Sequence, residues 1–157
     1  MKNLTLSIAT ILTLIIGLSI SLSAQTTATW QGGKPGRSTD WNCAANWSEG
    51  RIPDEFTQVI IPAGAEYYPV IKTEAAPIDA LLMEGGTELT LQKGAMLTVL
   101  GETGRFDGIT VLGKITNNGM LVIENASSTN IAFMRQIQGV GSVVNSLASI
   151  DSLAKGH

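Results

Sequence analysis

Short apolar segments, each introduced by a glycine, recur through the middle of this chain and limit the folds that it can adopt. Aliphatic side chains occupy alternate positions in Gly86-Thr-Glu-Leu-Thr-Leu, Gly94-Ala-Met-Leu-Thr-Val and Gly119-Met-Leu-Val-Ile. Alternation with a period of two predicts β-strands, and the glycines and asparagines between them predict turns. Repetition on this scale is typical of solenoids, in which each repeat buries its apolar face against the next.

The predicted strands are only about four to six residues long, which is short for a sandwich with defined hairpin loops. In a solenoid, the inward aliphatic side chains of one coil pack on those of the next, and glycine supplies corners with positive φ. We therefore predict an all-β fold, a short single-stranded right-handed parallel β-helix, or β-solenoid. The strand-like segments span residues 58–62, 69–71, 78–84, 87–92, 95–101, 108–113, 114–119 and 119–125.

A β-sandwich is the alternative fold, and one local signal supports it. Asn118-Gly119 matches a two-residue hairpin turn, so residues 111–116 and 120–124 could pair antiparallel. Asn117-Asn118-Gly119 would also suit a solenoid corner, because asparagine tolerates the left-handed backbone region. The spacing of the repeats favours the solenoid over the sandwich.

The first 24 residues are typical of a secretory signal peptide. Lys2 precedes an apolar run from Leu4 to Leu22, and the small residues Ser23-Ala24 predict cleavage before Gln25. The run is about long enough to span a bilayer, so an uncleaved anchor is the alternative. Cleavage predicts a secreted or cell-surface protein, with the periplasm as another destination, and no membrane span in the mature chain.

Charge and cysteine content exclude several classes of function. The formal net charge is −3, and loss of Lys2 with the signal peptide leaves nine basic and thirteen acidic residues, or 9 − 13 = −4. No basic patch occurs, so we expect no nucleic-acid partner. The single cysteine, Cys43, cannot form an intramolecular disulfide. It is expected to be a small buried hydrophobic residue, with an intermolecular or reactive thiol as the alternative.

The last residues of the chain carry a different pattern. Apolar residues fall at helix spacing at Val143, Val144, Leu147, Ile150 and Leu153. A short C-terminal amphipathic helix would cover the last coil, since solenoids need capped ends. In the alternative, residues 139–144 form one more strand and the remainder is a frayed tail.

Tryptophans and turn residues form a distinctive pattern ahead of the repeats. It reads W-x-G-G from Trp30 to Gly33, S-T-D-W-x-x-x-x-N-W-x-x-G-x-x-P from Ser38 to Pro53, and V-I-I-P from Val59 to Pro62. This pattern resembles the start of the β-solenoid region in large adhesin-like or matrix-like surface proteins of Bacteroidetes, many of them exported by the type IX system. The resemblance covers residues 29 to 125 and implies display or binding at the cell surface.

The chain departs from those surface proteins in two ways. It has Thr57 where they often carry an aspartate, and it reaches His157 without the C-terminal sorting domain that they usually possess. We therefore expect passage across the inner membrane rather than type IX export of this chain. A truncated fragment of a larger surface protein is a further alternative.

No catalytic constellation is found, so we expect neither an enzyme nor a cofactor. His157 is the single histidine and Cys43 the single cysteine, which argues against a Ser-His-Asp triad and against a zinc site. A polysaccharide-degrading solenoid is the enzymatic alternative, and it needs paired carboxylates. Coils of about 20 residues would align Glu84, Glu102 and Glu124 on one face. Scattered acidic residues are more often solvated outward positions.

The candidate ligand-binding residues are Trp30, Trp41, Trp47, Asp40 and Asn46. Flat indole rings stack on sugar rings, and the two polar side chains would add hydrogen bonds to a glycan. The structural interpretation, which we favour, is an aromatic N-terminal cap that buries large apolar rings over the first coil. Asp40 and Asn46 would then be turn residues that bond the neighbouring backbone.

Together these observations predict four regions and one main function. The regions are the signal peptide 1–24, a Trp-rich N-terminal cap 25–57, solenoid coils 58–141, and a C-terminal cap or frayed tail 142–157. We expect a secreted, non-enzymatic, adhesin-like or matrix-like module that acts by surface display or by binding an extracellular glycan or a cell-surface protein. A carbohydrate-binding or polysaccharide-degrading solenoid is the alternative. The ligand and the oligomeric state stay open.

Overall fold

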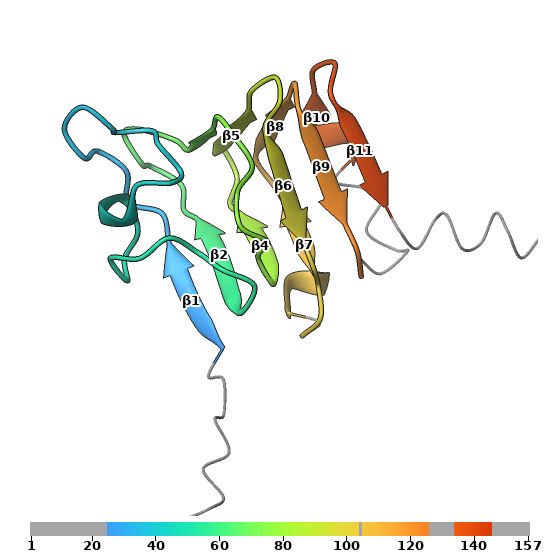
Figure 1. Cartoon of the computed structure of the whole chain (residues 1–157), viewed down its shortest axis with the longest axis horizontal. Coiled ribbons are helices and arrows are strands. Elements are labelled where there is room, and N and C mark those ends of the chain that lie inside the picture. The colour runs from blue at the N-terminus through green and yellow to red at the C-terminus, as the bar shows by residue number, and fades with distance from the viewer. Residues whose placement is uncertain (1–24, 104, 126–133, 146–157) are drawn as a thin grey trace, which may run out of the picture.

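The described part of the chain is a β-solenoid, as the repeats predicted (Figure 1). The computed structural model describes residues 25–103, 105–125 and 134–145. Every ladder between its strands is parallel. The β-sandwich alternative is therefore wrong. The predicted signal peptide and residues 146–157 of the predicted C-terminal helix lie outside the described residues.

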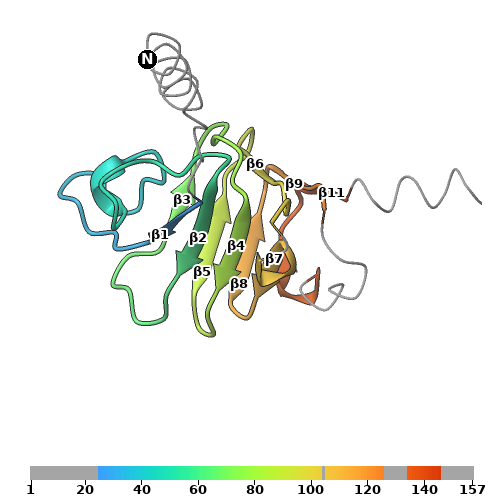
Figure 2. The same cartoon turned by 90° about the horizontal axis from the view of Figure 1, so that it is seen from below.

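Three parallel sheets form the sides of the solenoid. The first sheet contains β1 (Thr26–Thr29), β2 (Thr57–Ile61), β4 (Ala80–Met83) and β7 (Ile109–Val111). The second sheet contains β3 (Val70–Ile71), β5 (Glu88–Leu91), β8 (Lys114–Asn117) and β10 (Ile137–Gln138). The third sheet contains β6 (Met96–Val99), β9 (Met120–Ile123) and β11 (Ser142–Asn145). One complete coil thus runs through β4, β5 and β6, and the next through β7, β8 and β9 (Figure 2).

The core consists of rows of inward aliphatic side chains that stack in register along the solenoid. Strands such as β6 and β8 alternate between a buried inward side chain and a more exposed outward one. Successive coils align equivalent positions, so that aliphatic side chains rest on aliphatic side chains. The clearest rows are Leu81 on Ile109, Leu89 on Ile115 and Leu97 on Leu121, with every one of these residues fully buried.

The corner at Asn117 and Gly119 shows why this turn joins two sheets and not one hairpin. β8 and β9 lie in different sheets, so they do not pair as a hairpin. Neither Asn117 nor Asn118 has a positive φ, so the expected left-handed role of asparagine is wrong. The buried Asn117 acts through its side chain instead. Its Nδ2 donates to the carbonyl of Ser142 at 2.9 Å, and its Oδ1 accepts from the N–H of Gly119 at 3.0 Å. The expected positive-φ corners are found at Gly86 and Gly94, with φ of 79° and 82°.

Two segments differ from the sequence expectation. Residues 25–57 were expected to form only a cap, but β1 also adds a strand to the first sheet, with Thr26 opposite Thr57. At the other end, residues 142–145 form the strand β11 on β9, which agrees with the strand alternative for residues 139–144. In the described residues, no helix is long and apolar enough to cross a membrane.

The corner between β6 and β7 folds back on the first sheet. It contains the short 3₁₀ turn η2 (Arg105–Asp107), and Arg105 Nη1 donates to the side-chain oxygen of Gln58 at 2.9 Å. At the start of the same corner, Thr103 donates through its hydroxyl, at 2.5 Å, and through its N–H, at 3.2 Å, to the buried carboxylate of Asp79. These bonds anchor the corner to the solenoid wall.

Replacing Gly119 by alanine should destabilise the solenoid. A Cβ at this position would lie 2.2 Å from the carbonyl oxygen of Ala95 and 2.7 Å from that of Gln92, in the coil below. Because both atoms belong to the backbone, the coils must move apart, and we expect a loss of about 1–3 kcal/mol in the free energy of unfolding. Urea denaturation followed by circular dichroism measures this loss.

Gly85→Ala is the matched control for that substitution. Gly85 lies in the turn between β4 and β5, has no positive φ, and has no atom within 4 Å of a Cβ built on it. Its replacement should change the free energy of unfolding by less than about 1 kcal/mol. Equal effects of the two substitutions would contradict the tight stacking of the corners.

Candidate functional site

The three tryptophans form one buried cluster at the N-terminal end of the solenoid. Their exposed fractions are 1% for Trp30, 0% for Trp41 and 1% for Trp47. Trp47 lies between the other two, with ring centroids 4.9 Å from Trp30 and 4.7 Å from Trp41. Both pairs are edge-to-face at 80°, the arrangement that aromatic quadrupoles favour. The cluster packs directly onto the aliphatic core.

Two indole nitrogens tie the aromatic cluster to neighbouring backbone. Trp30 Nε1 donates to the carbonyl of Tyr67 at 2.7 Å, and Trp47 Nε1 donates to the carbonyl of Trp41 at 2.8 Å. Position 32, next to the bond between Trp30 and Tyr67, requires a glycine, since a Cβ there would lie 2.7 Å from the Tyr67 carbonyl oxygen. Within the described residues, the buried Nε1 of Trp41 meets no acceptor. Trp30 and Trp47 thus position the backbone of the cap as well as filling it.

Asn46 holds the loops around the tryptophans together. It is fully buried and belongs to the 3₁₀ turn η1 (Ala44–Asn46). Its Nδ2 donates to the carbonyls of Arg37 and Asp40, at 2.7 and 3.0 Å, and its Oδ1 accepts from the N–H of Lys34 at 3.0 Å. Every polar atom of the side chain is therefore committed to the fold.

Asp40 has a similar structural role at the edge of the cap. Its Oδ1 accepts from the N–H of Asn42 at 3.0 Å, and its Oδ2 forms an ion pair with Arg37 at 2.7 Å. Burial raises the pKa of this carboxyl, but the hydrogen bonds from Arg37 and Asn42 and the charges of Arg37 and Lys72 outweigh that effect and hold the pKa below its ordinary value. Asp40 is thus an ionised turn residue.

The five candidate residues therefore come together as a cap and not as an open sugar platform. None of the three indoles offers a ring face to solvent, so stacking of a glycan on them would require the cap to open. The side chains of Asp40 and Asn46 form hydrogen bonds with the backbone of the cap. Cys43 is buried and unpaired, as its small apolar character predicted.

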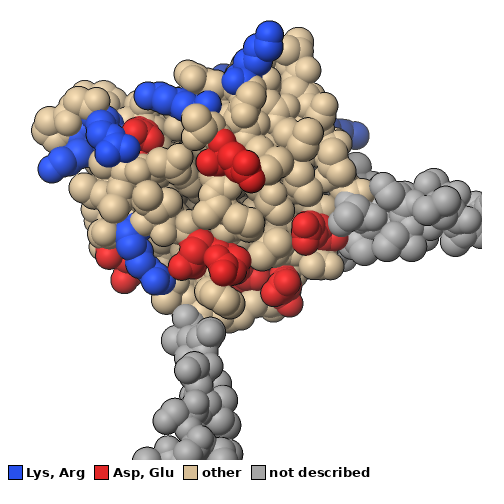
Figure 3. Space-filling view, viewed as in Figure 1, with Lys and Arg blue, Asp and Glu red and all other residues tan. Residues whose placement is uncertain are grey.

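The three carboxylates considered for catalysis do not share a face. Glu84 follows β4 of the first sheet and accepts a hydrogen bond from the N–H of Ala63 at 2.8 Å, whereas Glu124 follows β9 of the third sheet. The expected alignment of Glu84 with Glu102 and Glu124 is therefore wrong, because Glu84 and Glu102 belong to the same coil, after β4 and β6, and only Glu102 and Glu124 follow strands of one sheet. On the face in Figure 3, acidic side chains form several separate patches, some of them beside basic side chains. The described residues hold no group of three His, Cys, Asp or Glu that could bind a metal.

The second sheet presents a different candidate surface, which we call the polar ladder and define as Glu88, Thr90, Lys114, Thr116 and Gln138. Strand register places Glu88 beside Lys114, and Thr90 beside Thr116, which in turn lies beside Gln138. Lys114 Nζ forms an ion pair with Glu88 at 2.9 Å. A groove of about 280 Å³ lies at one side of this surface and is lined by Glu88, Lys114 and Gln138 of the ladder, together with Thr87, Leu112 and Gln136, but by neither Thr90 nor Thr116.

The polar ladder was not among the residues chosen from the sequence, although a signal for it exists. In both Glu88-Leu-Thr-Leu and Lys114-Ile-Thr-Asn, a charged residue, an aliphatic residue and a threonine follow one another. Aligning the repeats by this pattern would have placed the two threonines in one row. That Gln138 belongs to the same row could be found only from the strand register of the last coil.

Comparison with known proteins identifies a family but no function. A family model described as a domain of unknown function (DUF8693) matches residues 29–144. The matched span begins in β1 and ends in β11, so the family unit includes both the aromatic cap and the coils. No curated protein and no solved structure matches the chain.

The aromatic cap predicts an unequal response to two similar substitutions. Trp47→Phe removes the bond to the Trp41 carbonyl and disturbs both edge-to-face contacts, whereas Trp41→Phe removes no hydrogen bond and disturbs one contact. We expect Trp47→Phe to lower the free energy of unfolding by about 1 kcal/mol more than Trp41→Phe. Paired urea titrations measure the difference, and the reverse order would contradict the central position of Trp47.

Proposed function

The chain belongs to the family described as a domain of unknown function (DUF8693), and from that premise we propose that it is an exported, non-catalytic, adhesin-like module that binds an extended extracellular glycan. The polar ladder is the proposed contact surface. The observation that carries the proposal is the in-register repetition of hydrogen-bonding side chains on consecutive coils.

The geometry of the polar ladder suits an extended polymer better than a compact ligand. Neighbouring strands lie about 4.7–4.9 Å apart, so equivalent atoms on the ladder recur at that interval. The hydroxyl of a threonine and the amide of a glutamine can each both donate and accept a hydrogen bond. A polymer rich in hydroxyl groups that runs along the ladder, across the strands, would meet hydrogen-bonding side chains on consecutive coils.

The absence of a catalytic arrangement in the described residues supports binding rather than cleavage. The carboxylate of Glu88 in the ladder is paired with Lys114, and Glu84 lies in the corner after a different sheet. Glycoside hydrolysis needs two carboxylates that flank the bond to be broken. The resemblance of the tryptophan pattern to Bacteroidetes surface proteins supports an adhesive or matrix role, and the apolar first 24 residues support export.

Removal of two ladder groups should abolish most of the glycan binding. The probe is an array of neutral, uronic-acid-containing and sulfated polysaccharides, tested with the wild-type protein and with the double variant Thr116→Ala/Gln138→Ala. We expect selective binding by the wild type and a loss of about tenfold or more in the double variant, since two hydrogen bonds of about 1 kcal/mol each are removed.

Thr98→Ala is the control, because Thr98 is a partly exposed threonine on β6 of the third sheet. It should bind as the wild type does. The proposal is wrong if the folded wild type binds no polysaccharide, if the control loses as much affinity as the double variant, or if incubation shortens a polysaccharide.

Export makes a separate prediction that depends on the N-terminal segment alone. When the full-length chain is expressed in a Gram-negative host, the protein recovered outside the cytoplasm should begin at Gln25. N-terminal sequencing of the purified product checks the cleavage site, and fractionation checks the compartment. Recovery of the intact chain in the inner membrane would support the anchor alternative.

A further inference from the structure

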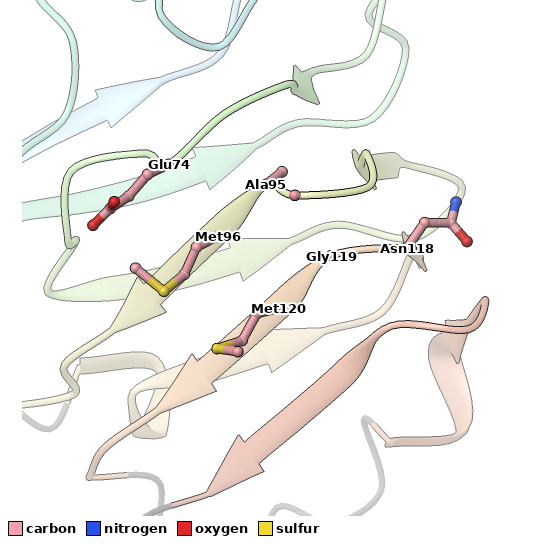
Figure 4. Close-up of a pocket in the computed structure, with 7 residues that line it drawn as sticks. Glu74, Ala95, Met96, Asn118, Gly119 and Met120 are labelled. Atoms are coloured by element: carbon pink, nitrogen blue, oxygen red, sulfur yellow. The ribbon is translucent and has the colours of Figure 1, made fainter.

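A row of one carboxylate and two thioethers crosses three consecutive coils on the outside of the solenoid. Glu74 forms a parallel bridge with Met96, and Met96 pairs in parallel register with Met120 of the next coil. Figure 4 shows the three side chains pointing in a similar direction, Met96 and Met120 from neighbouring strands and Glu74 from the segment between β3 and β4. Met96 is partly buried, and Met120 keeps 40% of its surface exposed. We call Glu74, Met96 and Met120 the methionine row.

The methionine row lies in a groove whose other lining residues leave room for a ligand. The cavity has a volume of about 390 Å³ and is lined also by Gly94, Ala95, Asn118 and Gly119. Three of these residues have a small side chain or none, and Figure 4 shows the Asn118 side chain at the far end, turned away from the sulfur atoms. The thioethers are therefore not covered by a larger neighbour within the groove.

The spacing of the two methionines matches a sulfur–metal–sulfur bridge. Side chains in register on neighbouring strands are separated by about 4.7–4.9 Å. Bonds between sulfur and a first-row metal are about 2.3 Å long, so an ion midway between the two sulfurs would contact both. From this match we propose that the methionine row binds one soft monovalent ion of the Cu(I) class, with the sulfurs of Met96 and Met120 as ligands and the neighbouring Glu74 carboxylate as the counter-charge.

The chemistry of the donors selects this class of ion over divalent metals. Thioethers are soft, neutral ligands that favour Cu(I), whereas calcium and magnesium require several oxygen ligands. One carboxylate balances the single positive charge of the ion and leaves the site neutral. The single histidine and the single cysteine argue against a zinc site, and methionines at outward strand positions lie outside that argument.

Titration with Ag(I), a redox-stable ion of the same class, tests the site directly. The protein carries ¹³C-labelled methionine methyl groups, and Cys43→Ala removes the buried thiol that would compete for the ion. We expect the methyl signals of Met96 and Met120 to shift together and to saturate at one ion per chain. Cu(I) added under reducing, oxygen-free conditions should shift the same two signals.

Single substitutions separate the site from non-specific binding to methionine. Met96→Leu and Met120→Leu keep the apolar volume and should each weaken Ag(I) binding at least about tenfold, and Glu74→Gln should weaken it less. Met134→Leu is the matched control, since Met134 is similarly exposed, at 42%, and does not line the groove. It should leave the affinity unchanged.

Two results would overturn the proposal. One is a folded protein in which neither Met96 nor Met120 shifts while the ion is present in excess. The other is an equal shift of Met134, with affinity unaltered by Met96→Leu, which would show that any exposed thioether binds the ion. Circular dichroism of each variant establishes that the coils are intact, so a loss of binding reports on the ligands.

Discussion

Parallel stacking in register is the constraint on which the rest of this structure depends. Once Leu97 lies over Leu121 and Leu89 over Ile115, the other residues of these paired strands acquire a neighbour of equivalent position in the next coil. Inward rows then become the core, outward rows become continuous surfaces, and corners must stack on corners. The corner rows tolerate little volume, which is why Gly119 lies above Ala95 with no room for a side chain. A shift of one residue in the pairing register of any strand would turn its inward apolar side chains to the outside, so the register is strongly specified.

A stacked core has ends, and the N-terminal end shows how one of them is closed. The first coil cannot bury its apolar face on a preceding coil, so large rings replace the missing neighbour. Trp47 makes this replacement compact, because it packs edge-on against both Trp30 and Trp41. Backbone hydrogen bonds hold the loops that carry the rings, and the side chain of Asn46 adds bonds to the backbone of Lys34, Arg37 and Asp40. The polar residues beside the tryptophans therefore serve the same purpose as the rings.

The sequence predicted the solenoid, its strands and the cap because these features depend on local patterns. Alternating leucines mark strands, and glycines such as Gly94 mark corners, whatever the coil length. The alignment of Glu84, Glu102 and Glu124 failed because the assumed repeat was shorter than one coil, so that Glu84 and Glu102 lie in the same coil, after β4 and β6. The polar ladder and the methionine row were missed because they depend on the strand register. Each is a relation between coils, and only the register shows that Thr90 meets Thr116 or that Met96 meets Met120.

The separation of inward and outward rows also explains how a fold of this kind can carry binding surfaces without weakening itself. In β8, Ile115 is buried in the core while its neighbour Thr116 is half-buried on the outside. The stability of the coil rests on the first residue, and the chemistry of the surface rests on the second. The polar ladder and the methionine row occupy different sheets, so one can change while the other and the core stay as they are. Function on such a scaffold is therefore encoded by the residue type that recurs at one outward position on consecutive coils, and not by any single residue or loop.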